Sequence, residues 1–152
     1  MSIVDLLFGK KKTFNHAKLG ILKSDRIKGN NQTKTYTWRG SILMGTNTTD
    51  TLMYLEGNNS APFSNHTDFV SQLVENWEST YLPDIEEEIR KKRIDQVEGF
   101  SNWKNDFYLA AIYAKNKKNT DFEITLEHED GKNLDTIGID VKNGIIANVE
   151  IY

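Results

Sequence analysis

The sequence predicts an α+β fold in which helices pack on a mainly antiparallel β-sheet, and three observations lead to this prediction. Residues 121–152 alternate apolar and polar side chains with a period of two, which is typical of strands that bury one face. Between residues 67 and 98, apolar residues recur every three or four positions instead, which is typical of an amphipathic helix. Strand-like segments stand on both sides of this helical segment, so the expected order is strands, helix, strands.

The first third of the chain is expected to supply the first strands. Residues 19–23 have a short β-like pattern, and residues 33–44 a longer one that is rich in β-branched and aromatic side chains. Gly40, inside the longer segment, predicts a bulge or a close approach of the backbone to a neighbour. A further strand is expected over residues 51–56. The Asn- and Thr-rich residues 45–50 before it predict a hairpin loop.

The segment from about residue 67 to residue 98 predicts one long kinked helix or two consecutive helices packed on the sheet. Its apolar side chains fall on one helical face, namely Phe69, Val70, Leu73, Val74, Trp77 and Tyr81. Pro83 predicts either the kink or the first turn of a second helix, because proline has no amide hydrogen to donate. Three glutamates, at 86 to 88, each stand four residues before a basic side chain, which predicts ion pairs along this helix.

Residues 105–114 are apolar on both faces, so their pattern fits a buried helix as well as a central strand. Their shortness and aromatic content favour the strand. In the C-terminal segment, Asp130-Gly131 and Asn143-Gly144 are turn signals. The second of them predicts a tight type I′ hairpin, since Asn and Gly both tolerate a positive φ.

Length and composition limit the class of protein. The 152 residues predict a single domain, 1–152, and contain 38% hydrophobic and 27% charged side chains, which is typical of a globular protein. A net charge of -3 disfavours nucleic-acid binding, which normally needs a basic surface. The absence of cysteine excludes disulfides and thiolate metal sites and suits a reducing compartment, so we expect a cytoplasmic protein.

The N-terminal segment combines an apolar run with basic residues. Residues 3–8 are mostly apolar, and Lys10, Lys11 and Lys12 follow them, an order opposite to that of a signal peptide. The run is far shorter than the roughly 20 residues that cross a membrane. We expect it to dock on the domain as a turn rather than to lie on a membrane surface, and we predict no membrane partner.

The three histidines, His16, His66 and His128, are the first candidates for chemistry, but none stands in a zinc-binding pattern. The side chains of Glu127, His128 and Glu129 alternate between the two faces of a strand, so they cannot converge on one metal ion. A nucleophile elbow, a phosphate loop and a dinucleotide-binding glycine pattern are absent. We predict no metal, no cofactor and no catalytic residue. The enzymatic alternative is a small hydrolase-like protein that uses His66 or His128 with carboxylates.

Several short motifs carry a resemblance to known families. Phe14 precedes Leu19-Gly20, Trp38-x-Gly40 follows in a strand, and the chain closes with a β-rich section. This order resembles small uncharacterised bacterial domain families that include immunity proteins, the antidotes to contact-dependent or polymorphic toxins. The resemblance implies a protein that binds a cognate toxin in the cytoplasm and thereby neutralises it.

A basic toxin domain is the partner that an acidic antidote would suit, because complementary charge accelerates association. The expected partner surface consists of six acidic side chains, namely Glu86, Glu87, Glu88, Glu127, Glu129 and Asp130. The alternative in a different class is a structural or regulatory module that self-associates through its sheet edges. The oligomeric state is left open by the sequence.

Overall fold

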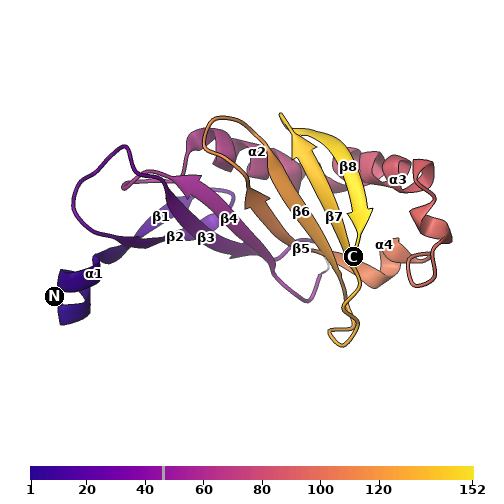
Figure 1. Ribbon diagram of the computed structural model, residues 1–152, viewed down its shortest axis with the longest axis horizontal. Coiled ribbons are helices and arrows are strands. Elements are labelled where there is room, and N and C mark those ends of the chain that lie inside the picture. Colours follow the sequence, from indigo (N-terminus) through magenta and orange to yellow (C-terminus); the bar gives the residue numbers. More distant parts are fainter. Residues whose placement is uncertain (46) are drawn as a thin grey trace.

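The computed structural model describes residues 1–45 and 47–152, and eight strands in them form one sheet in the order in which they occur along the chain. The strands are β1 Lys10–His16, β2 Gly20–Ile27, β3 Tyr36–Ile42, β4 Thr51–Gly57, β5 Phe107–Ala114, β6 Phe122–His128, β7 Thr136–Lys142 and β8 Ile145–Ile151. Figure 1 shows this sheet with α2 and α3 behind it and α1 at the far end. The predicted α+β class and largely antiparallel sheet are therefore confirmed.

One strand pair departs from the antiparallel pattern. β4 and β5 run parallel, whereas every other neighbouring pair of these strands is antiparallel. The helical elements lie between β4 and β5 in sequence and carry the chain back to the end of the sheet where β4 begins, which a parallel pair requires. They are α2 Ser64–Glu75, η1 Trp77–Tyr81, α3 Leu82–Lys91, η2 Ile94–Gln96 and α4 Trp103–Asp106, and α1 Ile3–Phe8 precedes β1.

The helical segment takes the form of consecutive helices joined by a π-helical turn. At that turn the amide of Leu82 donates to the carbonyl of Trp77, five residues back. Pro83 then occupies the first turn of α3, where its missing amide hydrogen is not needed. The second of the two predicted arrangements is thus present, although α2 begins at Ser64, three residues before the predicted start at residue 67.

The predictions for the turn and the central strand are confirmed. Asn143 has φ 51° and Gly144 has φ 78°, as a type I′ turn between β7 and β8 needs. Residues 107–114 form strand β5, while the short helix α4 occupies the positions just before it. The loop predicted over residues 45–50 joins β3 to β4, and Thr46 within it lies outside the described residues.

The N-terminal end differs from its prediction in two respects. β1 is a strand although its sequence is polar, and of its side chains Phe14 packs on the core, with its ring edge-on to Trp38 at 6.5 Å. The helix α1 has no buried residue, so the expected docking of this segment is wrong. Its contacts with the rest of the chain are polar, which leaves its apolar side chains in solvent.

The core lies between the sheet and the helices. Register places Met53, Ile112 and Ile124 side by side on the face that α2 and α3 cover, and Ile139 and Val149 continue this row. Phe69 of α2 packs on Phe122 of β6 with 4.5 Å between ring centres, and Ile85 and Ile89 of α3 are fully buried. Trp103 of α4 is buried as well.

Close packing around Gly40 explains why strand β3 has a glycine at this position. The register of β3 with β4 runs without a break, so there is no bulge at Gly40. A Cβ atom there would lie 2.5 Å from Cδ2 of Leu22 and 3.2 Å from Cε of Met53, both of them buried core residues. The predicted close approach is therefore the reason for the glycine.

Gly40→Val should lower the free energy of unfolding by about 1–3 kcal/mol, because the new side chain overpacks the core against Leu22 and Met53. Urea denaturation measures this loss. Ser41→Val is the matched control, because Ser41 is exposed on the same strand and its replacement should change stability by less than about 0.5 kcal/mol. Equal losses in the two variants would contradict the packing role of Gly40.

Candidate functional site

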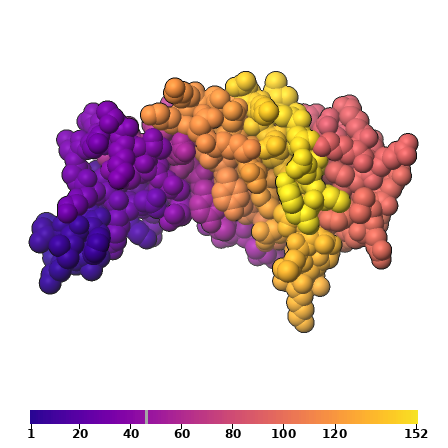
Figure 2. All heavy atoms as spheres, viewed as in Figure 1, coloured from indigo at the N-terminus to yellow at the C-terminus, as the bar shows by residue number. Residues whose placement is uncertain are grey.

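The candidate site is the face of the sheet that points away from α2 and α3. In the view of Figures 1 and 2 the strands stand in front of these helices, and no helix of the described chain covers them from that side. Alternation along each strand explains the contrast between the two faces. Tyr54, for example, lies between the buried Met53 and Leu55 of β4 and points to the opposite side.

One residue from each strand stands in a single row across this open face. The row is fixed by the strand register and reads Thr13, Lys23, Arg39, Tyr54, Tyr113, Glu123, Asp140 and Asn148. We call it the central row. Its charge changes along the sheet, from basic on β2 and β3, through two tyrosines on β4 and β5, to acidic on β6 and β7.

The two tyrosines form the middle of the central row. Their rings are stacked with 4.8 Å between centres and 9° between planes. Arg39 lies over the outer side of Tyr54, 6.0 Å from the ring centre, and its guanidinium also pairs with Asp25 at 3.1 Å. Tyr113 is 39% exposed, and Leu52 beside the pair is 43% exposed. An aromatic and aliphatic patch is therefore open to solvent at the centre of the face.

The acidic half of the face is partly neutralised. Lys115 pairs with Asp140 at 2.5 Å and is held charged there, since this carboxylate raises the pKa of Lys115. Within the described chain, no lysine or arginine comes within ion-pair distance of Glu123 or Glu127. Two carboxylates close to the tyrosines thus have no cationic partner of their own in the fold.

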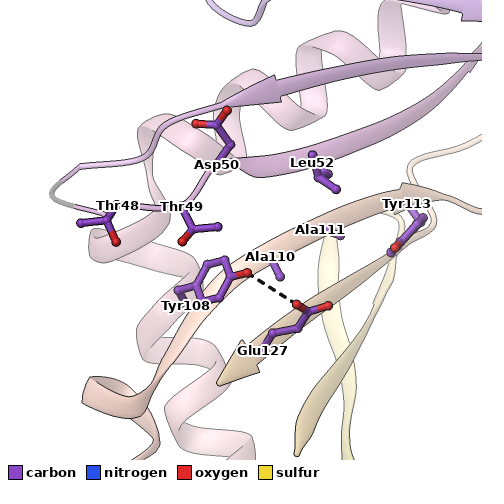
Figure 3. Close-up of a pocket in the computed structure, with 9 residues that line it drawn as sticks. All are labelled: Thr48, Thr49, Asp50, Leu52, Tyr108, Ala110, Ala111, Tyr113 and Glu127. Atoms are coloured by element: carbon purple, nitrogen blue, oxygen red, sulfur yellow. Dashed lines mark hydrogen bonds between the residues drawn. The ribbon is translucent and has the colours of Figure 1, made fainter. Parts of the chain in front are cut away.

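A hollow of about 470 Å³ opens beside the tyrosines, where the loop before β4 faces β5 (Figure 3). Leu52, Ala110 and Ala111 form its apolar part. Tyr108 points its hydroxyl toward Glu127, with 3.5 Å between the oxygens, a long hydrogen bond. The walls of this hollow combine apolar, phenolic and carboxylate groups, a combination that suits the aliphatic stem and charged head of a lysine or arginine side chain.

Two tyrosines of the face, Tyr108 and Tyr113, can act as hydrogen-bond donors at neutral pH. Partial burial, followed by the charge of Glu127, raises the pKa of Tyr108. Partial burial, followed by the neighbouring Tyr54 and the charges of Glu127 and Glu123, raises the pKa of Tyr113. Both phenols keep their protons, so each can donate to a partner while its ring provides apolar contact.

The six acidic residues predicted from sequence lie in different parts of the molecule. Glu86, Glu87 and Glu88 belong to α3, in the layer behind the sheet, whereas Glu127 is on the open face. The other two, Glu129 and Asp130, lie in the loop between β6 and β7. The predicted i to i+4 pairing is present for Glu86 with Arg90 at 2.7 Å and for Glu87 with Lys91 at 3.0 Å.

The carboxylates of α3 are therefore already engaged. Glu86 also contacts Lys104 of α4, and the hydrogen bond from Lys104 lowers the pKa of Glu86. Glu88 pairs with Lys91 at 2.9 Å. In contrast to Glu127, these side chains already share cations with their neighbours, which reduces the charge that they present to a partner.

A second hollow, of about 600 Å³, lies on the helical side between η1 and β5. Trp77, Trp103 and Leu82 provide much of its apolar wall, and Glu78 and Lys104 lie at its lining as charged groups. Trp77 and Leu82 are partly buried and pack on the core. This hollow is the gap between two packed layers, and Glu75 joins Glu78 and Lys104 as the charged residues of its lining.

His66 has a structural position. It is fully buried, its Nδ1 accepts the amide of Glu56 at 3.2 Å, and its Nε2 lies 2.8 Å from the carbonyl of Asn116. These partners fix the neutral tautomer with the proton on Nε2. The ring joins α2, β4 and the loop after β5. Both nitrogens are occupied by backbone groups, so neither faces a carboxylate.

The other candidate histidine, His128, is also bonded to the backbone. Its Nδ1 accepts the amide of Asp130 at 3.0 Å, and its ring packs edge-on against Phe107 with 5.1 Å between centres. In residues 1–45 and 47–152, no group of three or more His, Asp or Glu side chains is arranged to hold a metal ion. The same part of the chain contains no helix that is long and apolar enough to cross a membrane.

The position of His66 predicts a pH dependence of stability. Burial lowers the pKa of His66 below its usual 6.5, more than its hydrogen bond to Asn116 raises it. The unfolded chain takes up a proton near pH 6.5 that the folded chain refuses, so the free energy of unfolding should fall as pH drops below that value. The uptake of one such proton changes the free energy of unfolding by at most about 1.4 kcal/mol per pH unit.

Urea denaturation between about pH 5.5 and 7.5 measures this slope. In His66→Gln the slope should be flatter, because glutamine offers an acceptor and a donor but does not titrate. An equally steep slope in the variant would show that other groups cause the pH dependence.

Comparison of the chain with protein-family models, with curated proteins and with solved structures finds no match. The functional assignment therefore depends on the open face itself. Sequence reasoning identified Glu127 on this face but missed the tyrosine pair and Glu123. Each of these lies on the polar side of an alternating strand, yet their juxtaposition depends on which strands are neighbours.

Proposed function

We propose that this chain is a non-enzymatic binding protein, and specifically a bacterial immunity protein that neutralises a cognate toxin by binding it directly in the cytoplasm. The observation that carries the proposal is the central row on the open face. Tyr54 and Tyr113 form a stacked, solvent-accessible pair there, beside two carboxylates that have no cationic partner in the described chain.

The tyrosine pair suits a protein partner for physical reasons. Tyrosine is enriched at interface hot spots because its ring provides a large contact area with few rotatable bonds. Stacking holds Tyr54 and Tyr113 in place before a partner arrives, which lowers the entropy lost on binding. The eight-stranded sheet and its packed core form a rigid support for the pair.

The acidic half of the face favours a basic partner. Glu123 is the register partner of Tyr113 and Glu127 is that of Tyr108, and both carboxylates can pair with lysine or arginine of a toxin domain. Complementary charge steers association and accelerates it. The hollow lined by Tyr108, Leu52 and Glu127 offers room for one such basic side chain.

The six acidic residues predicted from sequence remain part of the proposal in a testable form. Glu127 belongs to the open face, whereas those on α3 belong to the opposite layer. Charge reversal at all six positions tests the predicted surface as a whole. Undiminished binding by that variant would exclude the predicted patch.

Co-expression with the protein encoded by the adjacent gene tests the function. We expect that protein to stop growth when it is produced alone, and we expect growth to be restored when this chain is produced with it. The two purified proteins should then elute as one complex in size-exclusion chromatography. Growth arrest that this chain does not relieve, together with separate elution, would exclude the proposal.

Self-association through sheet edges is the second candidate, because β1 and β8 each have one unpaired edge in the described chain. β1 is the less suitable edge, since it carries lysines and an irregularity between Lys11 and Thr13, both of which hinder strand addition. The mass of the protein in solution separates the two candidates. A monomer without the adjacent gene product favours the antidote.

A further inference from the structure

The helix α1 exposes nearly all of its apolar surface. Ile3, Leu6, Leu7 and Phe8 are 76%, 65%, 55% and 64% exposed, and Val4 is 46% exposed. At 100° per residue, these five side chains cover more than half of the helix circumference. Figures 1 and 2 show α1 as a projection at the end of the sheet, beyond β1 and β2. An apolar helix in this position is the reverse of the usual arrangement in a globular protein.

Polar contacts hold α1 in this orientation. Asp5, the one charged residue of the helix, pairs with Arg26 of β2 at 2.9 Å, and the same guanidinium donates to the carbonyl of Gly9 at 2.8 Å. Lys28 donates to the carbonyl of Leu7 at 3.0 Å, and Ser2 caps the first turn. The helix is thus fixed on its polar side and presents its apolar side outward.

The surroundings of α1 are strongly basic. The first 40 residues contain nine Lys or Arg and two Asp or Glu. The remaining 112 residues contain ten Lys or Arg and twenty Asp or Glu. Lys10, Lys11 and Lys28 are exposed and lie next to the helix in sequence or by contact. The first 40 residues, which include the exposed apolar helix, are therefore strongly basic in a chain whose net charge is -3.

We propose that α1 is a membrane-surface anchor that inserts its apolar side chains among the headgroups of an anionic lipid bilayer. The combination of an apolar wedge with a lysine rim matches what such a surface binds, and neither part requires a shaped groove in a partner. The anchor lies on the bilayer and does not cross it. This inference is independent of the proposed antidote function, because α1 lies outside the central row.

Sedimentation with lipid vesicles tests the anchor. The protein should sediment with phosphatidylcholine vesicles that contain about one third phosphatidylglycerol, and far less with phosphatidylcholine alone. Raising the salt from about 0.1 M to about 1 M should release it, since the screening length falls from about 10 Å to about 3 Å. Protein that stays in the supernatant with anionic vesicles at low salt would overturn the proposal.

Variants of exposed residues give the sharper test, because they leave the core unchanged. Leu7→Asp and Phe8→Asp should each lower the partition coefficient by at least about tenfold. Lys10→Gln and Lys11→Gln should each lower it by about fivefold. Leu134→Asp is the matched apolar control, since Leu134 is 87% exposed in the β6–β7 loop, and Lys117→Gln is the matched basic control.

The controls should partition like the unaltered protein. Equal partitioning of the α1 variants and the unaltered protein would overturn the proposal. A second result would also overturn it: the unaltered protein does not bind vesicles, and Leu7→Asp lowers its mass in solution. In that case α1 would be a contact between copies of this chain.

Discussion

Replacing Trp38 with alanine should lower the free energy of unfolding by about 3–5 kcal/mol, the largest stability loss that we expect from a single substitution in this chain. Trp38 is fully buried in β3, where its ring meets the edge of Phe14. Its Nε1 donates to the carbonyl of Asn58 at 3.1 Å. Alanine would leave a cavity between the sheet and the loop that follows β4, and it would remove the donor for a partly buried carbonyl.

Urea denaturation measures this loss, and two variants separate its causes. Trp38→Phe keeps most of the apolar packing but removes the donor, so its loss should be nearer to about 1–3 kcal/mol. Trp77→Ala removes the same side chain from a half-buried position on η1 and should cost less than Trp38→Ala. A Trp38→Ala variant that is destabilised no more than Trp77→Ala would contradict the central place of Trp38 in the core.

The second large effect concerns partner binding. Tyr54→Ala and Tyr113→Ala should each weaken the complex with the adjacent gene product by at least about thirtyfold, as expected for hot-spot tyrosines. The reason is the loss of the stacked pair at the centre of the open face. Calorimetric titration measures the dissociation constant.

Conservative and peripheral replacements are the controls for this effect. Tyr54→Phe and Tyr113→Phe keep the rings, so they should retain most of the affinity. Tyr152→Ala removes a tyrosine that is 72% exposed at the end of the chain and should have little effect. If Tyr152→Ala weakens the complex as much as Tyr113→Ala does, the tyrosine pair is not the centre of the interface.

Local signals in the sequence predicted those elements whose structure is set locally. Asn143-Gly144 predicted the last hairpin because positive φ is a property of those two residues. Helical periodicity around Leu73 and the proline at 83 predicted the helical segment and its division. The π-helical turn at Trp77–Tyr81 was not predictable, since it follows from how two helices must join while both remain packed on the core.

Other features depend on contacts between distant parts of the chain. β1 is polar, and it is a strand because it pairs with β2. The parallel pairing of β4 with β5 follows from the path of the helical connection, which periodicity does not describe. α1 was expected to dock because apolar residues usually do, whereas the contacts of Asp5 with Arg26 turn its apolar side outward.

The candidate site was predictable only in part for the same reason. Glu127 could be placed on the exposed side of its strand from alternation alone. The pairing of Tyr54 with Tyr113 could not be predicted, because these two register partners lie on β4 and β5, which the whole helical connection separates in the sequence. A surface built from one residue per strand becomes visible only when the strand order and register are known.

A comparison of two charge-reversal variants tests the open-face interface most directly. The first carries Glu123→Lys and Glu127→Lys on the open face, and the second carries Glu86→Lys, Glu87→Lys and Glu88→Lys on α3. Calorimetric titration with the adjacent gene product should show affinity reduced at least about thirtyfold in the first variant and nearly unchanged in the second. Unchanged affinity in the first variant, or a larger loss in the second, would contradict the open face as the binding surface.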